Sequence, residues 1–514
     1  MLALLAILPV VVIFLLLVLK KTPADIAGSI GWIVTFAVAW LFFKTPAIVI
    51  LQSSLAGLVA SLPIALVVAT SILQITIMIE SGAIARIVAL VKTISPGNQA
   101  IQIMVINVGF GTLLAALGAV PVSILPPIMI AMGYSSFAAI ALPAIGYDAL
   151  CTYALLGVPV VVFSGFIGAS VQEVGIYFAR YMPFISTSIA IGMLWIVGRW
   201  KLVKAGLLPA VVTGLTAGLI CIAMNLAGLV TITGIAAGVG VMLIMLLYLK
   251  IIRQPVISRA VLNENDIQVE KKINLAAALS PWLILTFFSL LVNAPFLPFF
   301  NLTFNRFSMP LEIIPGAPEK VRVFWQAYFW ILVSTVAALP FLRPSPDQLK
   351  VTLKKWMKRF PRPTYTAAIF FAIAFIINHS GKTMDWQLLV PQQNMVYVLA
   401  NGAAAVFGMA YPFIAPFLGL LGGFISGSET SSIAMLTALH LSTAEKIGAL
   451  GVLVAAASGI GGGLASVISP AKLQNAAAAI DRIGEETKVI PTTFVISLVI
   501  TAVCGLLTLF WAFR

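Results

Sequence analysis

Long apolar stretches separated by short polar loops recur along the whole 514-residue chain. A helix needs about 20 apolar residues to cross the hydrocarbon core of a bilayer, which is about 30 Å thick. The chain is 61% hydrophobic and 9% charged, whereas soluble domains average about 45–50% and about 25%. A membrane β-barrel would show segments of about ten residues with alternating polarity, and these stretches do not alternate. We therefore predict an all-α polytopic membrane protein with about 12 to 14 transmembrane helices.

Regular apolar stretches and two irregular ones make up the predicted membrane region. The irregular ones are Gly118–Phe166 and Pro412–Ala478, which glycine, proline and polar residues interrupt. The regular ones are Ala3–Leu19, Ile26–Phe43, Leu55–Ile79, Ile101–Leu117, Tyr177–Val197, Leu207–Ala227, Leu229–Ile251, Ile273–Val292, Phe324–Leu342, Thr366–His379, Asn394–Tyr411, Gly448–Ser458 and Val489–Trp511.

Basic residues concentrate in short loops, and these carry much of the net charge of +14. Arg199–Lys204 and Arg343–Arg362 are predicted to be cytoplasmic, because lysine and arginine favour that side of the membrane. The loop Asn293–Lys320 then lies outside. This bias explains the charge without a nucleic-acid partner. The first apolar run precedes Lys20 instead of following a basic segment, so we interpret it as a span and not as a signal peptide. The predicted location is the cell (inner) membrane, with multiple passes.

The cysteines and histidines indicate neither a metal centre nor an enzyme. Cys151, Cys221 and Cys504 lie in apolar stretches at unrelated spacings, which predicts no disulfide framework and no metal site. The two histidines, His379 and His440, are far apart, and His440 is expected near the surface. No motif of nucleophile, acid and base was recognised. We predict no cofactor, and we predict that the chain is not an enzyme.

A polar segment, Arg253–Lys272, divides the chain nearly in half and is the predicted cytoplasmic linker. Residues 1–252 and 273–514 are the two predicted halves, each with one irregular apolar region. At one fixed offset, Phe110–Leu114 aligns with Phe417–Leu421. We therefore predict two repeats with re-entrant hairpins near residues 110–134 and 412–440, the pattern that marks a transporter binding site. Unrelated gaps between ordinary helices are the alternative.

The polar segment Ser426–Ser432 is the strongest candidate site, because polar groups at membrane depth need partners, water or a ligand. A broken helix there would present free N–H groups and a partial positive charge to an anion. Glycine leaves room and hydroxyl groups add donors. The predicted substrate-binding residues of this segment are Gly427, Ser428, Thr430, Ser431 and Ser432.

Two further segments have a similar composition. Gly459–Pro470 contributes Ser466 and Ser469, although its glycines are equally typical of close helix packing. Gly146–Tyr153 contributes Tyr147, Asp148 and Tyr153. At the fixed offset, Gly118 and Ser123 belong to the turn that aligns with residues 425–430, which makes them candidate substrate ligands as well.

Glu429 and Asp148 are the candidates for ion coupling. A carboxyl group in an apolar site can bind and release a proton near neutral pH. The same group can instead complete a sodium site beside backbone carbonyl groups. The residues themselves leave both possibilities open.

At these residues the chain resembles the lactate permease family of bacterial and archaeal monocarboxylate transporters. The resemblance rests on Pro416–Gly419, Gly427–Ser432 and Ile468–Pro470. It implies uptake of L-lactate or glycolate with protons. It also implies membership of the ion transporter superfamily, with two inverted repeats and an elevator movement of a transport domain against a scaffold. A small carboxylate and the lipid bilayer are the implied partners, and a homodimer is the candidate assembly.

The chain departs from the family pattern at three places. Leu114–Pro121 lacks the acidic residue expected in the first hairpin, the Asn-Thr pair expected near Tyr147 is missing, and Ser466 stands where lysine is usual. Asp148 is a candidate replacement for the missing acid. These differences leave a second hypothesis open, in which the chain is a sodium-coupled or passive transporter of another small organic anion.

Overall fold

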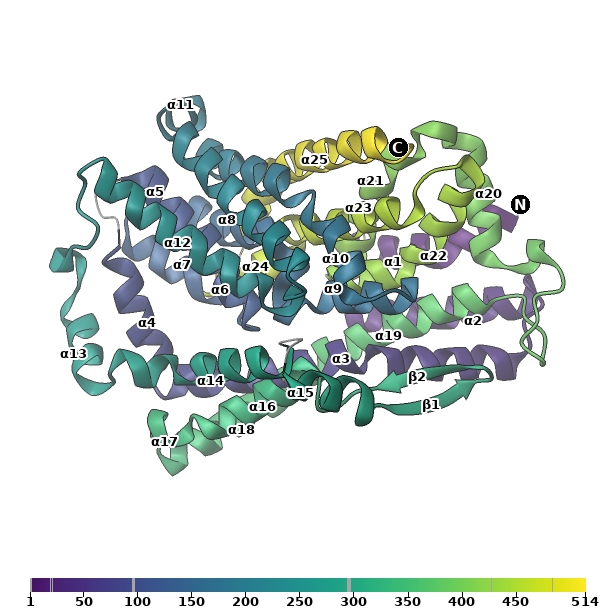
Figure 1. The fold of residues 1–514 in the computed structure, drawn as a ribbon, viewed down its shortest axis with the longest axis horizontal. Coiled ribbons are helices and arrows are strands. Elements are labelled where there is room, and N and C mark those ends of the chain that lie inside the picture. Colours follow the sequence, from purple (N-terminus) through teal and green to yellow (C-terminus); the bar gives the residue numbers. More distant parts are fainter. Residues whose placement is uncertain are drawn as a thin grey trace.

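The computed structural model describes residues 2–18, 20, 22–94, 98–293, 297–426, 428–482 and 484–514. The described chain is overwhelmingly helical, and most helices run roughly along the long axis of the molecule (Figure 1). The first half contains α1 Leu2–Val18, α2 Ala24–Leu41, α3 Ala47–Glu80, α4 Ala83–Lys92, α5 Gln99–Ile103, the π-helix η1 Met104–Phe110, α6 Gly111–Ala116, α7 Pro121–Ala131, α8 Ser136–Gly146, the 3-10 helix η2 Tyr147–Tyr153, α9 Ala154–Ile167, α10 Val171–Ala179, α11 Met182–Leu226, η3 Val230–Ile232 and α12 Thr233–Ile251.

The predicted linker contains a short 3-10 turn, η4 Arg259–Val261, and α13 Glu264–Lys272. The second half contains α14 Leu275–Asn293, α15 Pro298–Asn301, η5 Leu302–Arg306, β1 Met309–Ile314, β2 Ala317–Val321, α16 Ala327–Ala337, α17 Leu339–Leu342, α18 Pro346–Arg359, α19 Pro361–His379, η6 Pro391–Gln393, α20 Met395–Phe407, η7 Gly408–Ala410, α21 Tyr411–Ser426, α22 Glu429–Ile447, α23 Gly451–Leu464, η8 Ala465–Ile468, α24 Pro470–Ala478 and α25 Glu486–Trp511.

Eleven helical stretches of the described chain are long and apolar enough to cross a membrane, and three shorter apolar helices accompany them. This confirms the predicted all-α polytopic class. One long stretch, α11, is two helices, because Gly198 and Arg199 have non-helical dihedral angles. Its two arms pack tightly: a Cβ atom on Gly214 would lie 2.1 Å from the Thr187 hydroxyl oxygen. The predicted spans 177–197 and 207–227 correspond to these arms.

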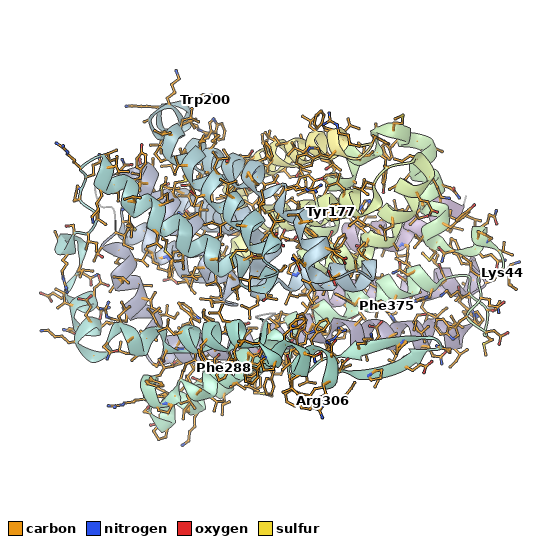
Figure 2. The ribbon with its side chains drawn as sticks, viewed as in Figure 1. Lys44, Tyr177, Trp200, Phe288, Arg306 and Phe375 are labelled. Atoms are coloured by element: carbon orange, nitrogen blue, oxygen red, sulfur yellow. The ribbon has the colours of Figure 1, made fainter. Side chains whose placement is uncertain are left out.

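The predicted cytoplasmic loops gather at one end of the molecule. The labels of α13 and α17 and the tip of α11, where Trp200 lies, are at the left of the view, whereas Lys44 lies at the right (Figures 1 and 2). The predicted linker is partly folded, because α13 docks on α4. The Lys92 ammonium is 2.9 Å from the Asp266 carboxylate, and the Arg86 guanidinium is 3.0 Å from that of Glu270.

The predicted outer loop 293–320 contains a feature that the sequence pattern did not reveal. Strands β1 and β2 form an antiparallel hairpin in which Met309 pairs with Val321 and Pro310 with Lys320. Most residues of the hairpin are exposed, so its residues have no clear alternation of apolar and polar side chains. Without that alternation the usual sequence signal for a strand is missing.

One order of elements occurs twice: a helical hairpin and then a helix that is interrupted by a 3-10 turn. The first copy is α6–α7 followed by α8–η2–α9, and the second is α21–α22 followed by α23–η8–α24. The two copies interlock, because α22 packs on α9 while α24 packs on α7 and α8. The interruptions η2 and η8 are thereby brought into the same part of the core. The division into two inverted repeats remains a prediction.

Candidate functional site

The second hairpin is interrupted where α22 begins. Ser428 has an extended backbone conformation and caps α22, its hydroxyl oxygen accepting a hydrogen bond from the Ser431 amide at 3.4 Å. The Ser432 hydroxyl donates to the Gly419 carbonyl at 3.0 Å and ties the two arms together. The predicted ligand Gly427 lies outside the described residues. Ser428 and Ser432 therefore stabilise the hairpin at the point where it is interrupted.

The remaining hydroxyl groups of this segment are buried. Thr430 is 4% exposed and Ser431 is fully buried. Within the described chain, the Ser431 hydroxyl has no hydrogen-bond partner. A buried hydroxyl without a partner carries an energetic penalty, which a bound ligand would relieve. Ser431 is thus the hydroxyl of this segment that is best prepared to receive a ligand.

Glu429, the first residue of α22, meets Thr152 of η2. The Thr152 hydroxyl donates to Glu429 Oε1 at 2.7 Å, and both side chains are buried. The other carboxylate oxygen, Oε2, makes no hydrogen bond of ordinary geometry with the residues that the structure describes, and the Cys151 thiol acts electrostatically on the same carboxylate. A carboxylate at a helix N-terminus is favoured by the helix dipole. Glu429 therefore has one oxygen fixed and one oxygen open to a further partner.

The space for this carboxylate depends on Gly463 at the end of α23. A Cβ atom on Gly463 would lie 2.6 Å from Glu429 Oε2, closer than atoms can approach without moving. The Cys151 Cβ would also be only 3.3 Å away. Gly463 therefore contributes the room in which the Glu429 carboxylate lies.

The other glycines of this segment serve helix packing. A Cβ atom on Gly461 would lie 1.9 Å from the Pro416 carbonyl oxygen, and one on Gly419 would lie 1.8 Å from that of Ser458. The backbones of α21 and α23 are therefore in direct contact, as small residues allow in membranes. Close packing therefore explains Gly461, whereas Gly463 leaves room for the Glu429 side chain; binding of a substrate by this segment stays a prediction.

Asp148 of η2 is the second buried acid, at 4% exposure. Neither of its carboxylate oxygens makes a hydrogen bond of ordinary geometry with the described residues. Ser466, Lys472 and Glu429 all act on it electrostatically. Two carboxylates and one ammonium group therefore share a single region of the core, where the low dielectric strengthens their interactions.

Lys472 of α24 brings the positive charge into this region. Its Nζ atom donates to the Ser466 hydroxyl at 2.6 Å, and the side chain is half-buried. Ser466 is the position at which the resemblance leads one to expect lysine. Lys472, six residues further along the chain, therefore places an ammonium group next to this position. Ser469, also buried, precedes the N-terminus of α24 without capping it by its side chain.

Two other predicted ligands have their contacts elsewhere. The Tyr153 hydroxyl accepts a hydrogen bond from Asn225 at 2.9 Å and donates to the Gly175 carbonyl at 3.3 Å. Gly118 has a φ of +85°, and a Cβ atom there would lie 2.6 Å from the Ser71 hydroxyl oxygen. The first hairpin turn therefore packs against α3. The side chains of Ser123 and Tyr147 lie outside the described residues.

His440 was expected near the surface, and this expectation was wrong. The side chain is fully buried on α22, and its Nδ1 atom is 2.8 Å from the Tyr411 hydroxyl oxygen. The position looks exposed from the sequence because polar residues follow it. In the fold, α22 packs against α20 and α21, which cover this face. The Tyr411 hydroxyl satisfies one ring nitrogen, and this pair belongs to the internal packing of the hairpin.

Sequence reasoning missed Thr152 and Lys472. Thr152 lies within the candidate segment Gly146–Tyr153. In the fold, the Thr152 hydroxyl reaches Glu429, whereas the predicted ligand Tyr153 does not. Lys472 is a basic residue three positions after Ser469, a spacing that a helix beginning at Pro470 brings back toward Ser466. In the described part of the chain, no group of three or more His, Cys, Asp or Glu residues could hold a metal ion.

Interrupted helices that meet at buried, incompletely partnered charges define a class of polytopic membrane protein, the transporters. The sequence profile of the L-lactate permease family matches residues 2–513, so the chain belongs to this family. An L-lactate permease of Salmonella typhimurium is 26% identical over 551 residues, which covers 99% of this chain and 96% of the relative. The glycolate permease GlcA of Escherichia coli is 27% identical over 556 residues, with the same coverage. An L-lactate permease of Bacillus subtilis is 25% identical, over 94% and 91% of the two chains. The protein is thus a permease of the cell membrane and not an enzyme.

Proposed function

We propose that the protein takes up a small monocarboxylate, L-lactate or glycolate, together with a proton. The observation that carries this proposal is the Glu429 carboxylate beside the Lys472–Ser466 pair. One of its oxygens accepts from Thr152, and the other makes no hydrogen bond of ordinary geometry with the described residues. The printed names of the relatives supply the substrate class.

The substrate carboxylate would bind at the Lys472 ammonium group. The Ser466 hydroxyl already accepts from Lys472, and the Ser431 hydroxyl is buried without a partner in the described chain. The N-termini of α22 and α24 add partial positive charge. The two predicted ligands Ser428 and Ser432 would act indirectly, because both hold the hairpin turn in shape.

The balance of charges supports coupling to a proton. Glu429 and Asp148 together carry two negative charges when ionised, against the single ammonium group of Lys472. A bound substrate adds another negative charge in a region of low dielectric, so two negative charges would remain unbalanced. Binding a proton to one of the two acids removes half of this excess. The substrate anion and the proton therefore favour each other's binding, which is the requirement for symport.

Movement would follow the elevator scheme that the family resemblance implies. The two hairpins and the two interrupted helices form an interlocked unit, and α3, α14, α16 and α19 form a neighbouring layer of helices. We propose that the first unit carries the substrate and that the second is the scaffold. The first unit would contain the hairpins of the two predicted inverted repeats, and the second would stay fixed in the membrane.

Uptake into proteoliposomes tests the function. Purified protein is reconstituted, a proton gradient is imposed with or without a sodium gradient, and accumulation of labelled L-lactate and glycolate is measured. We expect accumulation above equilibrium that requires the proton gradient alone. Glu429→Gln should abolish this accumulation, whereas Glu445→Gln, at the exposed end of the same helix, should not. Accumulation driven only by sodium, or equilibration without accumulation, would contradict proton symport.

A further inference from the structure

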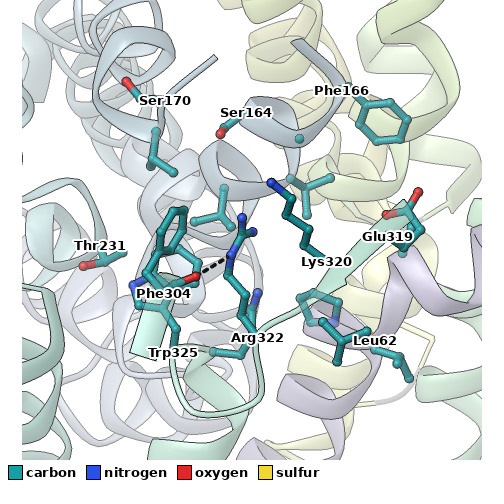
Figure 3. Close-up of a pocket in the computed structure, with 18 of the residues that line it drawn as sticks. Leu62, Ser164, Phe166, Ser170, Thr231, Phe304, Glu319, Lys320, Arg322 and Trp325 are labelled. Atoms are coloured by element: carbon teal, nitrogen blue, oxygen red, sulfur yellow. Dashed lines mark hydrogen bonds between the residues drawn. The ribbon is translucent and has the colours of Figure 1, made fainter. Parts of the chain in front are cut away.

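A cavity of about 800 Å³ lies away from the buried acids, between α9 and α10 on one side and α3, α19 and the β-hairpin on the other. Its volume is in the range of small-molecule sites, which is about 300–1,000 Å³. Figure 3 shows its lining, with Ser164 on the side toward which the Lys320 and Arg322 side chains extend. The outer wall is formed by the hairpin that the sequence predicts to lie outside the membrane.

Two cationic side chains enter this cavity from one strand. Lys320 in β2 and Arg322 just after it are two residues apart, so their side chains leave the same face of the extended chain. Figure 3 shows both reaching in the same direction, toward Ser164. In the part of the chain that the structure describes, neither forms an ion pair with an acid. Glu319 also lines the cavity, so two cations face one acid, and the lining keeps a net positive charge when all three are ionised.

The Arg322 side chain is held in place. Its Nε atom donates to the Phe304 carbonyl at 3.0 Å, and its guanidinium carbon lies 4.0 Å from the centre of the Phe304 ring. These contacts use one N–H group and one face of the guanidinium and leave its fork available to a carboxylate. Burial lowers the pKa of Arg322 and raises that of Glu319, so both groups are partly withdrawn from water.

The opposite wall is apolar. Leu62 and Pro63 of α3 line it together with Phe166 of α9. The Phe166 ring lies 6.4 Å from that of Phe371 and 6.1 Å from that of Phe375, both on α19. A cavity with two cations on one side, of which Arg322 is held in place, and apolar side chains on the other matches a small organic acid, which has a carboxylate head and a short apolar body.

The cavity and the buried acids lie at opposite ends of one helix. Thr152 precedes α9 and Ser164 is near its other end. Leu155, Leu156 and Gly157 have left-handed dihedral angles, so the regular part of α9 begins after them. From Val158 to Ser164, about seven helical residues at about 1.5 Å each correspond to roughly 10 Å. We propose that Lys320 and Arg322 form a peripheral site that holds a small carboxylate on the outer side before it reaches Glu429 and Lys472. This inference rests on the proposed function.

The test is the concentration dependence of L-lactate uptake by proteoliposomes with Lys320→Gln and with Arg322→Gln. Positive charge in a cleft raises the local concentration of an anion by tenfold or more. We therefore expect KM to rise about 3- to 10-fold in each variant, with little change in the maximal rate. Arg306→Gln is the matched control, because Arg306 is an exposed cation of the same loop that does not line the cavity. Lys320 is exposed and its replacement leaves the Phe304 contact intact, so misfolding cannot explain its effect.

An equal rise in KM for Arg306→Gln, or no rise for Lys320→Gln, would overturn the peripheral site. So would an effect that appears only in vesicles containing phosphatidylglycerol and not in vesicles of phosphatidylcholine, because the occupant would then be a lipid headgroup. Equilibrium binding of labelled L-lactate to the purified protein separates the two proposals. If the wild-type protein binds but does not accumulate L-lactate, the proposed function fails. The peripheral site then stands if Arg322→Gln weakens binding and Arg306→Gln does not, and it falls if the two bind alike.

Discussion

The Thr152 hydroxyl lies 2.7 Å from Glu429 Oε1, although 277 positions separate the two residues in the chain. This single hydrogen bond joins η2, which interrupts the helix α8–α9 of the first copy, to the start of α22 in the hairpin of the second copy. It also determines which Glu429 oxygen is fixed and which one is open to a ligand or a proton.

Replacement of Thr152 by valine tests this bond. Valine has nearly the same shape but no donor, so neither Glu429 oxygen would have a hydrogen bond of ordinary geometry from the described residues. A hydrogen bond to a charged group contributes about 1.5–3 kcal/mol, which corresponds to roughly 10- to 100-fold in binding or rate. We expect kcat/KM for L-lactate uptake to fall by that factor. Thr152→Ser keeps the hydroxyl and should retain most of the activity. Equal losses in the two variants would indicate a packing role instead.

Alanine substitutions at Gly463 and Gly423 distinguish a glycine that makes room for the Glu429 side chain from one that allows two helices to pack closely. In Gly463→Ala the new methyl group meets the tip of the Glu429 side chain, which can turn away. In Gly423→Ala it would lie 2.1 Å from the backbone oxygen of Gly462, which cannot move without shifting a helix. We expect Gly463→Ala to yield folded protein with uptake reduced at least about tenfold, and Gly423→Ala to be destabilised by about 1–3 kcal/mol. Thermal unfolding and uptake measure the two effects, with Gly402→Ala as the control. Unimpaired uptake by Gly463→Ala would contradict the assigned role.

Lys472 provides a test of substrate recognition. Lys472→Gln removes the ammonium group that donates to Ser466, so KM for the carboxylate should rise about tenfold or more while the protein remains folded. Lys472→Arg keeps the charge and should show a smaller rise. Lys488→Gln, an exposed lysine at the start of α25, is the control for a general loss of positive charge. An unchanged KM in Lys472→Gln would place the substrate elsewhere.

The sequence predicted the elements of this site better than their pairing. Apolar run lengths were sufficient for the membrane class, and the polar residues near 428 and 148 lie where the structure interrupts its helices. The contact between Thr152 and Glu429 depends on how two distant segments pack, and no local pattern encodes that choice. The same holds for His440, whose burial depends on the helices that cover α22. Gly463 faces the Glu429 carboxylate and Gly461 faces the backbone of α21, and this difference depends on which face of α23 each residue occupies.

The docked linker helix gives the last prediction. Asp266 is a buried residue of α13 whose carboxylate binds the Lys92 ammonium at 2.9 and 3.0 Å and also accepts from the Asn263 amide. Asp266→Asn retains an acceptor for the amide but removes the charge, so it leaves the half-buried Lys92 without its counter-ion. We expect α13 to be held on α4 less tightly, by about 1–3 kcal/mol, because a hydrogen-bonded ion pair is replaced by a neutral contact. Trypsin should then cleave after Arg259, Lys271 or Lys272 at least several-fold faster than in the wild-type protein. Asp347→Asn, whose side chain is 93% exposed and 3.9 Å from Lys350, should cleave at the wild-type rate. Equal cleavage rates for the Asp266 and Asp347 variants would mean that the linker is held by other contacts.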